Sequence, residues 1–249
     1  MISVEHKGDV ALLRLSHGKV NALDVELLDA LDAALAALAT SSARAVVVTG
    51  DGRAFCAGVD LLRVLDGGDT YVDTLIPALG RAFESLFTFP KPTVAAVNGP
   101  AIAGGCIVAC ACDRRVVAED AVIGASELRV GVPFPAAALE IVRHCCGRHT
   151  DTVLLGAGLV RGEPARALGL ADELVPADQV VDRSMALADE LAALQGPGYA
   201  LAKAQLRAPA LGRIRAGAAD DARVRRLWAT PETAAAIRTS LERTTGKAR

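Results

Sequence analysis

The sequence contains very few aromatic residues, only 3% of its 249 residues, although 52% are hydrophobic. An interior with so little aromatic volume has to be built mainly from Ala, Val and Leu in close contact. Close packing around small side chains favours a layered α/β structure. The chain is also long enough for one large domain with an appendage, and its core needs neither disulfides nor a structural metal.

The chain has no excess of charge of either sign, since 27 Lys and Arg face 29 Asp and Glu, a formal net charge of −2. This balance gives no electrostatic reason to expect nucleic acid or an anionic membrane as a partner. The first residues, Met1 to Gly8, lack an apolar run of the kind found in signal peptides, and the longest apolar stretch, Thr93 to Cys112, is interrupted by Asn98-Gly99-Pro100. We therefore expect a cytoplasmic protein.

The six cysteines show no Cys-x-x-Cys pair and lie inside apolar runs. This placement indicates buried free thiols in a reducing compartment and no disulfide framework. In the sequence, the adjacent Cys145-Cys146 and the alternating Cys110-x-Cys112 have no matching His or Cys cluster, so no metal site is expected.

Strand-like and helix-like segments alternate along most of the chain. Short apolar runs predict strands at 10–15, 45–49 and 94–97, and the last two look buried on both faces, as in a parallel sheet. Helices are expected at 25–38, with Asp24 as N-cap, and at about 74–86, after a flexible loop at 66–69. Further strands are expected near 115–118 and 122–124, and further helices from Gly104 and near 136–144, 151–156 and 164–168.

The last part of the chain is almost purely helical from Gln179 onward. We divide the chain into an α/β core, residues 1–196, and a C-terminal helical region, 197–249, with Gly196-Pro197-Gly198 as a hinge and Pro231 at the start of a helix. An apolar stripe in this region should pack on the core or on a neighbouring subunit; it comprises Leu206, Leu211, Ile214, Val224, Leu227 and Trp228.

Two glycine-rich segments, 52–61 and 98–106, each follow a buried strand and lead into a helix. Free backbone N–H groups collect at such helix starts and suit an anionic oxygen, so together the two segments could form a two-donor oxyanion hole. Each segment taken alone could also be an ordinary strand-to-helix turn. A dinucleotide fingerprint is excluded after Gly50-x-Gly52, because Phe55 stands where the third glycine would fall.

Taken together, the segments resemble the crotonase (enoyl-CoA hydratase/isomerase) superfamily, whose signatures have the forms AFCAGxDL and NGxAxGG…CD. The matching stretches are Asn21-Ala22-Leu23, 54–61, 98–113, 124–131 and the later Glu163, Ala165, Leu168 to Leu170 and Lys203. The resemblance covers nearly the whole chain. It implies a spiral of repeated ββα units, a helical C-terminal trimerisation region, and a homotrimer or dimer of trimers.

The resemblance also implies an acyl-CoA substrate whose thioester carbonyl lies between the backbone N–H groups of Val59 and Gly104. Coenzyme A enters as part of the substrate, and no further cofactor is implied. The residues then expected around the CoA and acyl portions are Ala22, Ala57, Val59, Asp60, Leu61, Leu62, Gly104 and Ile107.

The resemblance places the catalytic base at Glu127, near C2 of the acyl chain. A glutamate in an apolar pocket would have its pKa raised toward neutrality, as proton shuttling requires. The alternative for Glu127 is a surface carboxylate with a cationic partner.

The chain departs from hydratases at Ile107, where they carry a second glutamate that positions water. An aliphatic residue there resembles the mitochondrial-type Δ3,Δ2-enoyl-CoA isomerases, in which one glutamate suffices for a 1,3-proton shift. Pro135 stands where dienoyl-CoA isomerases and hydroxyacyl-CoA hydrolases carry an aspartate. The alternatives are an enoyl-CoA hydratase, if another carboxylate such as Glu140 reaches the pocket instead of pairing with Arg143 or Arg148, and a non-catalytic acyl-CoA-binding homologue.

Overall fold

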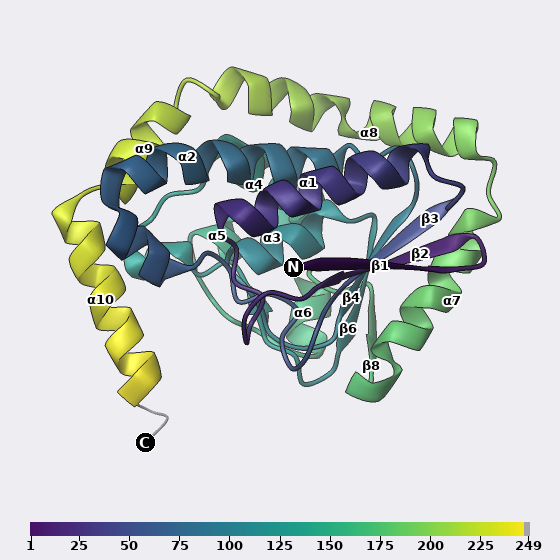
Figure 1. Cartoon of the computed structure of the whole chain (residues 1–249), viewed down its shortest axis with the longest axis horizontal. Helices are drawn as coiled ribbons and strands as arrows, with labels where there is room; N and C mark the ends of the chain where they lie inside the picture. Colours follow the sequence, from purple (N-terminus) through teal and green to yellow (C-terminus); the bar gives the residue numbers. More distant parts are fainter. Residues whose placement is uncertain (247–249) are drawn as a thin grey trace.

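A six-stranded sheet forms the centre of the computed structural model, which describes residues 1–246, with side chains through residue 243 (Figure 1). The strand order is β1-β2-β3-β4-β6-β8, in which only β1 runs antiparallel to its neighbour. The strands are β1 (Ile2–Lys7), β2 (Val10–Leu15), β3 (Ala45–Gly50), β4 (Thr93–Val97), β6 (Arg114–Ala118) and β8 (Glu173–Val175). A second, two-stranded parallel sheet pairs β5 (Ala101–Ile102) with β7 (Ile123–Gly124).

Helices cover the central sheet and continue into the C-terminal region. α7 packs against β2, β3, β4 and β6, while α2, α3 and α4 contact one another and α8 packs on α4. In Figure 1, α8 runs along the upper edge and α10 descends beside α2 toward the C-terminus. The helices are α1 (Val25–Thr40), α2 (Leu61–Phe87), α3 (Gly104–Ala111), α4 (Ala136–Cys146), α5 (Thr150–Leu154), α6 (Glu163–Ala167), α7 (Val180–Ala192), α8 (Gly196–Gly217), α9 (Asp221–Trp228) and α10 (Pro231–Gly246).

Most of the expected elements are confirmed within two or three residues. β3 and β4 are fully buried, as expected for strands covered on both faces. Asp24 is the N-cap of α1, and its carboxylate accepts the Leu27 amide at 2.8 Å. The sequence did not predict β1 or β8, because β1 is largely polar and β8 has only three residues. None of the described helices is both long and apolar enough to cross a membrane.

The flexible loop expected at 66–69 is wrong, because this segment lies inside α2. Only Gly68 leaves the helical conformation, with φ of 55° and ψ of −148°, and it kinks the helix there. A left-handed φ is accessible to glycine at little cost, so one residue bends the helix without ending it.

The apolar stripe of the C-terminal region divides into two sets. Ile214, Val224 and Trp228 are buried, whereas Leu206 is 71% exposed and Leu227 43% exposed. The Gly196-Pro197-Gly198 segment forms the first turn of α8 and no separate hinge, which agrees with the tolerance of proline at a helix start. The last three residues of the proposed C-terminal region, 247–249, lie outside the described residues.

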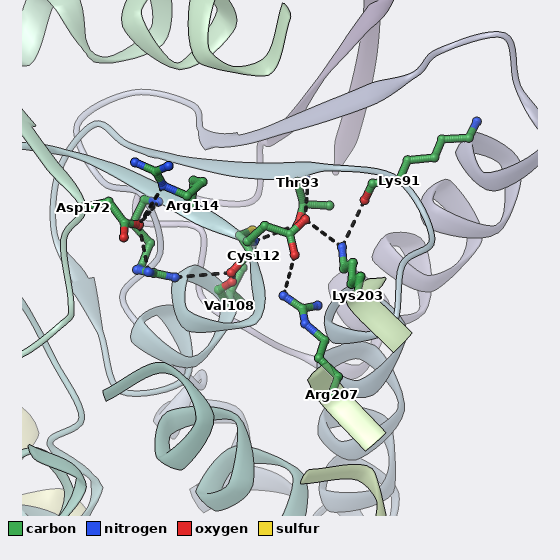
Figure 2. Close-up of polar contacts among 10 residues, drawn as sticks. Lys91, Thr93, Val108, Cys112, Arg114, Asp172, Lys203 and Arg207 are labelled. Atoms are coloured by element: carbon green, nitrogen blue, oxygen red, sulfur yellow. Dashed lines mark hydrogen bonds and ion pairs between the residues drawn. The ribbon is translucent and has the colours of Figure 1, made fainter. Parts of the chain in front are cut away.

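A buried ion network fixes α8 to the sheet (Figure 2). The Asp113 carboxylate accepts hydrogen bonds from Lys203 Nζ at 2.7 Å and from Arg207 Nη2 at 2.6 Å. It also accepts the amide and the hydroxyl of Thr93, at 2.8 and 3.1 Å, at the start of β4. Since both cations are themselves buried, Asp113 provides the negative charge that compensates them.

We expect Asp113→Ala to destabilise the fold strongly, because it leaves two buried cations without their carboxylate, a change that costs about 3–5 kcal/mol. Chemical denaturation of both proteins measures the difference. Glu163→Ala is the matched control, since it removes an ion pair with Arg166 in which both side chains are more than half exposed. Equal stability of the Asp113 and Glu163 variants would contradict this account of the network.

Candidate active site

The two glycine-rich loops lie side by side because β3 and β4 are parallel neighbours in the sheet. Both loops leave the carboxyl ends of these strands, so they meet at the same edge. Hydrogen bonds join them directly: the Cys56 amide donates to the Pro100 carbonyl at 3.1 Å, and the Ile102 amide donates to the Cys56 carbonyl at 3.0 Å. The loops thus behave as one unit.

Close backbone contact between the loops requires glycine at three positions, Gly58, Gly99 and Gly105. A methyl group at Gly105 would lie 2.1 Å from the Cys56 carbonyl oxygen, a contact that backbone atoms cannot relieve. A methyl group at Gly58, whose φ is +87°, would lie 2.8 Å from the Ile102 carbonyl oxygen and 3.3 Å from the Gly104 amide nitrogen. The turn that carries Val59 therefore lies directly against the start of α3.

The amides of Val59 and Gly104 are both left available by the backbone pattern around them. Leu23 pairs with Val59 in a parallel bridge that uses the Gly58 carbonyl and the Asp60 amide, so the Val59 amide points away from Leu23. Gly104 is the first residue of α3 and has no intrahelical acceptor for its amide. The positive end of the helix dipole adds to the attraction for an anion there.

Ala103, just before Gly104, has an unusual backbone conformation with φ of 52° and ψ of −123°. A positive φ is costly for a residue with a side chain, and such strain concentrates at functional sites. The Ala103 amide donates to the Gly124 carbonyl at 2.8 Å, and this bond ties the strained residue to β7. The strain sets the direction in which the Gly104 amide points.

The residues predicted to contact CoA line the same edge in two segments. Ala22 and Ala57 are partly exposed, and the Ala57 amide donates to the Val20 carbonyl at 3.0 Å. Asp60 is the N-cap of α2 and accepts the amides of Leu62 and Arg63, so its carboxylate already has a structural role. Leu61 is partly buried, and Leu62 is 60% exposed. The structure brings these segments together without showing a ligand contact.

Glu127 begins a short 3-10 turn (Glu127–Val130) three residues after β7. Its side chain is buried, and Oε2 has no hydrogen-bond partner among the described residues. Burial raises the pKa of the Glu127 carboxyl to about 8. The sequence-based alternative, a surface glutamate paired with a cation, is wrong.

C-terminal helices support the segment that carries Glu127. α10 packs on the 3-10 turn, and the Trp228 indole of α9 donates from Nε1 to the Pro133 carbonyl at 2.9 Å. Asp221 accepts the Ala136 amide at 2.9 Å, at the start of α4. Sequence reasoning did not find these supports, because each joins residues far apart in the chain.

Ile107 is completely buried on α3, one turn after Gly104. Residues three positions apart on a helix lie on the same face, so the aliphatic side chain of Ile107 lies on the face of α3 that begins at Gly104. Ile107 can neither orient a water molecule nor accept a proton from one.

Glu140, the other acid considered for the site, is buried and fully engaged elsewhere. Its two carboxylate oxygens accept hydrogen bonds from Arg143 of the same helix and from Arg213 of α8. The expected pairing with Arg143 is confirmed, and Arg213 is an additional partner that the sequence did not indicate. Two guanidinium groups hold this carboxylate between α4 and α8.

A polar cluster that sequence reasoning missed fixes the segment around Ala22. Asn21, with φ of 53°, donates from its amide side chain to the carbonyls of Asp51 and Ala54, at 3.1 and 2.9 Å. Asp24 Oδ2 lies 2.6 Å from His17 Nε2 and accepts Arg63 Nη1 at 2.8 Å. Asp24 and Arg63 together connect the starts of α1 and α2. The asparagine at position 21 could have indicated a left-handed turn there, since asparagine tolerates this backbone conformation better than most residues.

Comparison with known proteins agrees with this architecture. The sequence model of the family described as enoyl-CoA hydratase/isomerase matches residues 5–242. A protein of Thermus thermophilus described as a putative enoyl-CoA hydratase is 40% identical over 199 residues, which cover 77% of this chain and 78% of that protein.

Two solved structures cover most of the chain. The human mitochondrial Δ3-Δ2-enoyl-CoA isomerase superposes with a TM-score of 0.93 at 26% identity, covering 99% of this chain and 98% of that chain. A Mycobacterium tuberculosis protein described as an enoyl-CoA isomerase, in its apo form, gives a TM-score of 0.82 at 34% identity and covers 89% of this chain and 97% of that chain; a second structure of the same protein is described as a probable enoyl-CoA hydratase. The chain therefore belongs to the enoyl-CoA hydratase/isomerase family and has the crotonase fold that its two glycine-rich motifs predicted.

Proposed function

We propose that this family member is a Δ3,Δ2-enoyl-CoA isomerase that works with one glutamate. The observation that carries the proposal concerns the buried carboxylates of the described residues, which are Asp24, Glu127 and Glu140. Asp24 and Glu140 have arginine partners, whereas Glu127 has no cationic partner in the described part of the chain. A single buried carboxyl with a pKa of about 8 is suited to taking up and returning a proton near neutral pH.

In the proposed reaction the thioester carbonyl of a 3-enoyl-CoA accepts the amides of Val59 and Gly104. Glu127 removes a proton from C2, and the resulting negative charge develops on the carbonyl oxygen, where the two amides and the α3 dipole stabilise it. The double bond moves from C3=C4 to C2=C3 as protonated Glu127 delivers its proton to C4. One proton moves and no electrons leave the substrate, so this reaction calls for no redox cofactor.

The second candidate is enoyl-CoA hydratase, which the description of the Thermus thermophilus relative favours. Addition of water to C2=C3 needs a group that orients and deprotonates the water while Glu127 serves C2. Ile107 lacks such a group, and Glu140 is held by Arg143 and Arg213. These residues favour the isomerase. The unpaired, buried Glu127 argues against a third possibility, a non-catalytic acyl-CoA-binding homologue.

Assembly and localisation remain proposals. The exposed Leu206 and Leu227 of the C-terminal region would be covered in a homotrimer or a dimer of trimers, the assembly that we infer for this chain. We further propose that the protein acts in the cytoplasm on acyl-CoA substrates of fatty-acid metabolism.

The first prediction compares two substrates on the wild-type enzyme. Because one glutamate can shuttle a proton but cannot also activate water, kcat/KM for isomerisation of a 3-enoyl-CoA should exceed kcat/KM for hydration of crotonyl-CoA. Both rates are measured on the same preparation. A hydration rate well above the isomerisation rate would contradict the single-glutamate mechanism and favour the hydratase.

A second prediction concerns Glu127→Gln, which keeps the side-chain shape but cannot carry the proton. Isomerisation should fall by about 100- to 10,000-fold, the usual contribution of a general acid–base group. In the wild type, kcat/KM should rise with pH up to about 8, because the free enzyme must have Glu127 deprotonated. A pH-independent kcat/KM between pH 6 and 8 would exclude Glu127 as the base.

The same variant should change the pH dependence of stability. The pKa of Glu127 is raised in the folded state from 4.5 to about 8, so between these pH values the folded protein holds a proton that the unfolded chain releases. The wild type therefore loses stability as pH rises through this window. Glu127→Gln should be more stable than wild type by a margin that grows from pH 5 to pH 8, as thermal melting would show. Glu119→Gln, at an exposed position, should show no such trend.

The third prediction tests the oxyanion amide at Gly104. Gly104→Pro removes the N–H and should lower kcat by at least about 100-fold, in line with the ~2.7–4 kcal/mol that one oxyanion donor contributes. Because a proline restricts the residue before it, and Ala103 has φ of 52° and ψ of −123°, the melting curve of the variant is compared with that of the wild type before its kcat is interpreted. Gly104→Ala is the control, because it keeps the amide and its methyl group is crowded only by the end of the Leu23 side chain, at 2.8 Å, with the next atoms at 3.7 Å. Equal turnover of the two variants would remove the Gly104 amide from the mechanism.

A further inference from the structure

Cys110 is distant in the sequence from the adjacent Cys145 and Cys146, and the three meet where α3 packs on α4. The sulfur atoms of Cys110, Cys145 and Cys146 all lie within 4.8 Å of one another. Cys110 lies near the end of α3, and Cys145 and Cys146 are the last two residues of α4. In the sequence, Cys145-Cys146 and Cys110-x-Cys112 are two separate pairs without further ligands nearby, which is why no metal site is expected from spacing alone. The fold brings Cys110 to the Cys145-Cys146 pair, whereas Cys112 lies outside the cluster.

The geometry suits three sulfur ligands around one ion. With metal–sulfur bonds of about 2.3 Å, three thiolates around a common ion stand about 3.8–4.0 Å apart. The observed limit of 4.8 Å is larger by less than 1 Å, a gap that side-chain rotation can close. Cys145 is partly exposed while Cys110 and Cys146 are buried, so an ion has a route of entry to an otherwise enclosed position.

The chemistry around the sulfurs favours a soft cation. The described residues add no His, Asp or Glu to this cluster. The guanidinium of Arg115 is buried and near enough to Cys110 and Cys145 to interact with their charge, and its own carboxylate partner, Asp172, lies 2.8 Å away. Arg115 would offset part of the negative charge of three thiolates. Cys145 Sγ also lies 3.4 Å from the Gly169 carbonyl oxygen, a weak partner that an ion can replace.

We propose that Cys110, Cys145 and Cys146 form a binding site for a soft d10 cation, Cu(I), held by three thiolates. Soft sulfur ligands select Cu(I) and Zn(II), but Zn(II) takes four ligands in nearly all sites, and Cu(I) is satisfied by three. Each coordinating thiol releases its proton to solvent, so one Cu(I) replaces three protons. No electron is transferred. The site is separate from the proposed isomerase reaction and does not depend on it.

The test titrates the reduced whole protein with Cu(I) under anaerobic conditions, against a competing coloured Cu(I) chelator. We expect one Cu(I) per chain, confirmed by native mass spectrometry, and an increase in Tm on binding. Groups that merely hydrogen-bond to metal ligands contribute about 10–100-fold to affinity, so loss of a ligand in Cys145→Ala or Cys146→Ala should weaken binding by at least about 100-fold.

Cys112→Ala is the matched control, because Cys112 is a buried cysteine two residues after Cys110 whose Sγ is turned to the Val108 carbonyl, 3.6 Å away (Figure 2). This variant should bind Cu(I) like the wild type. No stoichiometric binding, or equal loss in Cys112→Ala, would overturn the proposal. X-ray absorption of the wild type is independent of every variant: three sulfur neighbours support the site, and a shell of nitrogen or oxygen overturns it. Zn(II) that resists displacement by Cu(I) would overturn the assignment to Cu(I).

Discussion

The close approach of two backbone loops is the constraint on which the rest of the site depends. The Cys56 carbonyl lies where a side chain at Gly105 would begin, with only 2.1 Å to the position of a methyl group. This contact exists because β3 and β4 are adjacent and parallel, so the chain leaves both strands at one edge. It brings the turn of Val59 against the first turn of α3, and two unused amides come to lie together. No side chain supplies these donors. Their placement tolerates many side-chain changes but very few changes of these glycines.

The buried Glu127 carboxyl lowers the stability of the folded protein at this site when it is charged. Burial without a cationic partner disfavours the charged form of the Glu127 carboxyl and so raises its pKa. Asp24 and Glu140, the other buried acids of the described residues, are both neutralised by arginine. The contrast indicates that Glu127 is held in place by its surroundings, through β7 on one side and through α9 and α10 on the other. Such a local loss of stability is common where function needs a reactive group.

The sequence predicted what depends on local pattern. The apolar runs of β2 and β3, the Asp24 cap and the helix start at Pro231 are all visible over a few residues. Local sequence patterns did not predict features that depend on contacts between residues distant in the chain. Residues 66–69 have the composition of a loop, yet only Gly68 leaves the helical conformation, and the buried Val64 and Val72 of α2 lie on either side of it. Two sets of ion pairs join α8 to the rest of the protein: Arg213 binds Glu140 of α4, and Lys203 and Arg207 bind Asp113, just before β6. No spacing rule in the sequence connects these residues. For the candidate site, the two loops could be found from glycine patterns, whereas the strain at Ala103 could not.

α3 is the element through which these features act on one another. It spans only Gly104–Ala111, so its oxyanion amide, Ile107 and Cys110 lie within two turns. All eight residues are buried, and the helix therefore cannot shift without disturbing its contacts with α2 and α4. Replacing Ile107 with a carboxylate would place a second acid near Glu127 in this enclosed position, where the two would compete for protons and raise each other's pKa. In the reaction that we propose, the aliphatic residue leaves Glu127 as the one proton carrier of the described site. That restriction would suit a proton transfer between C2 and C4 and would leave water without a group to activate it.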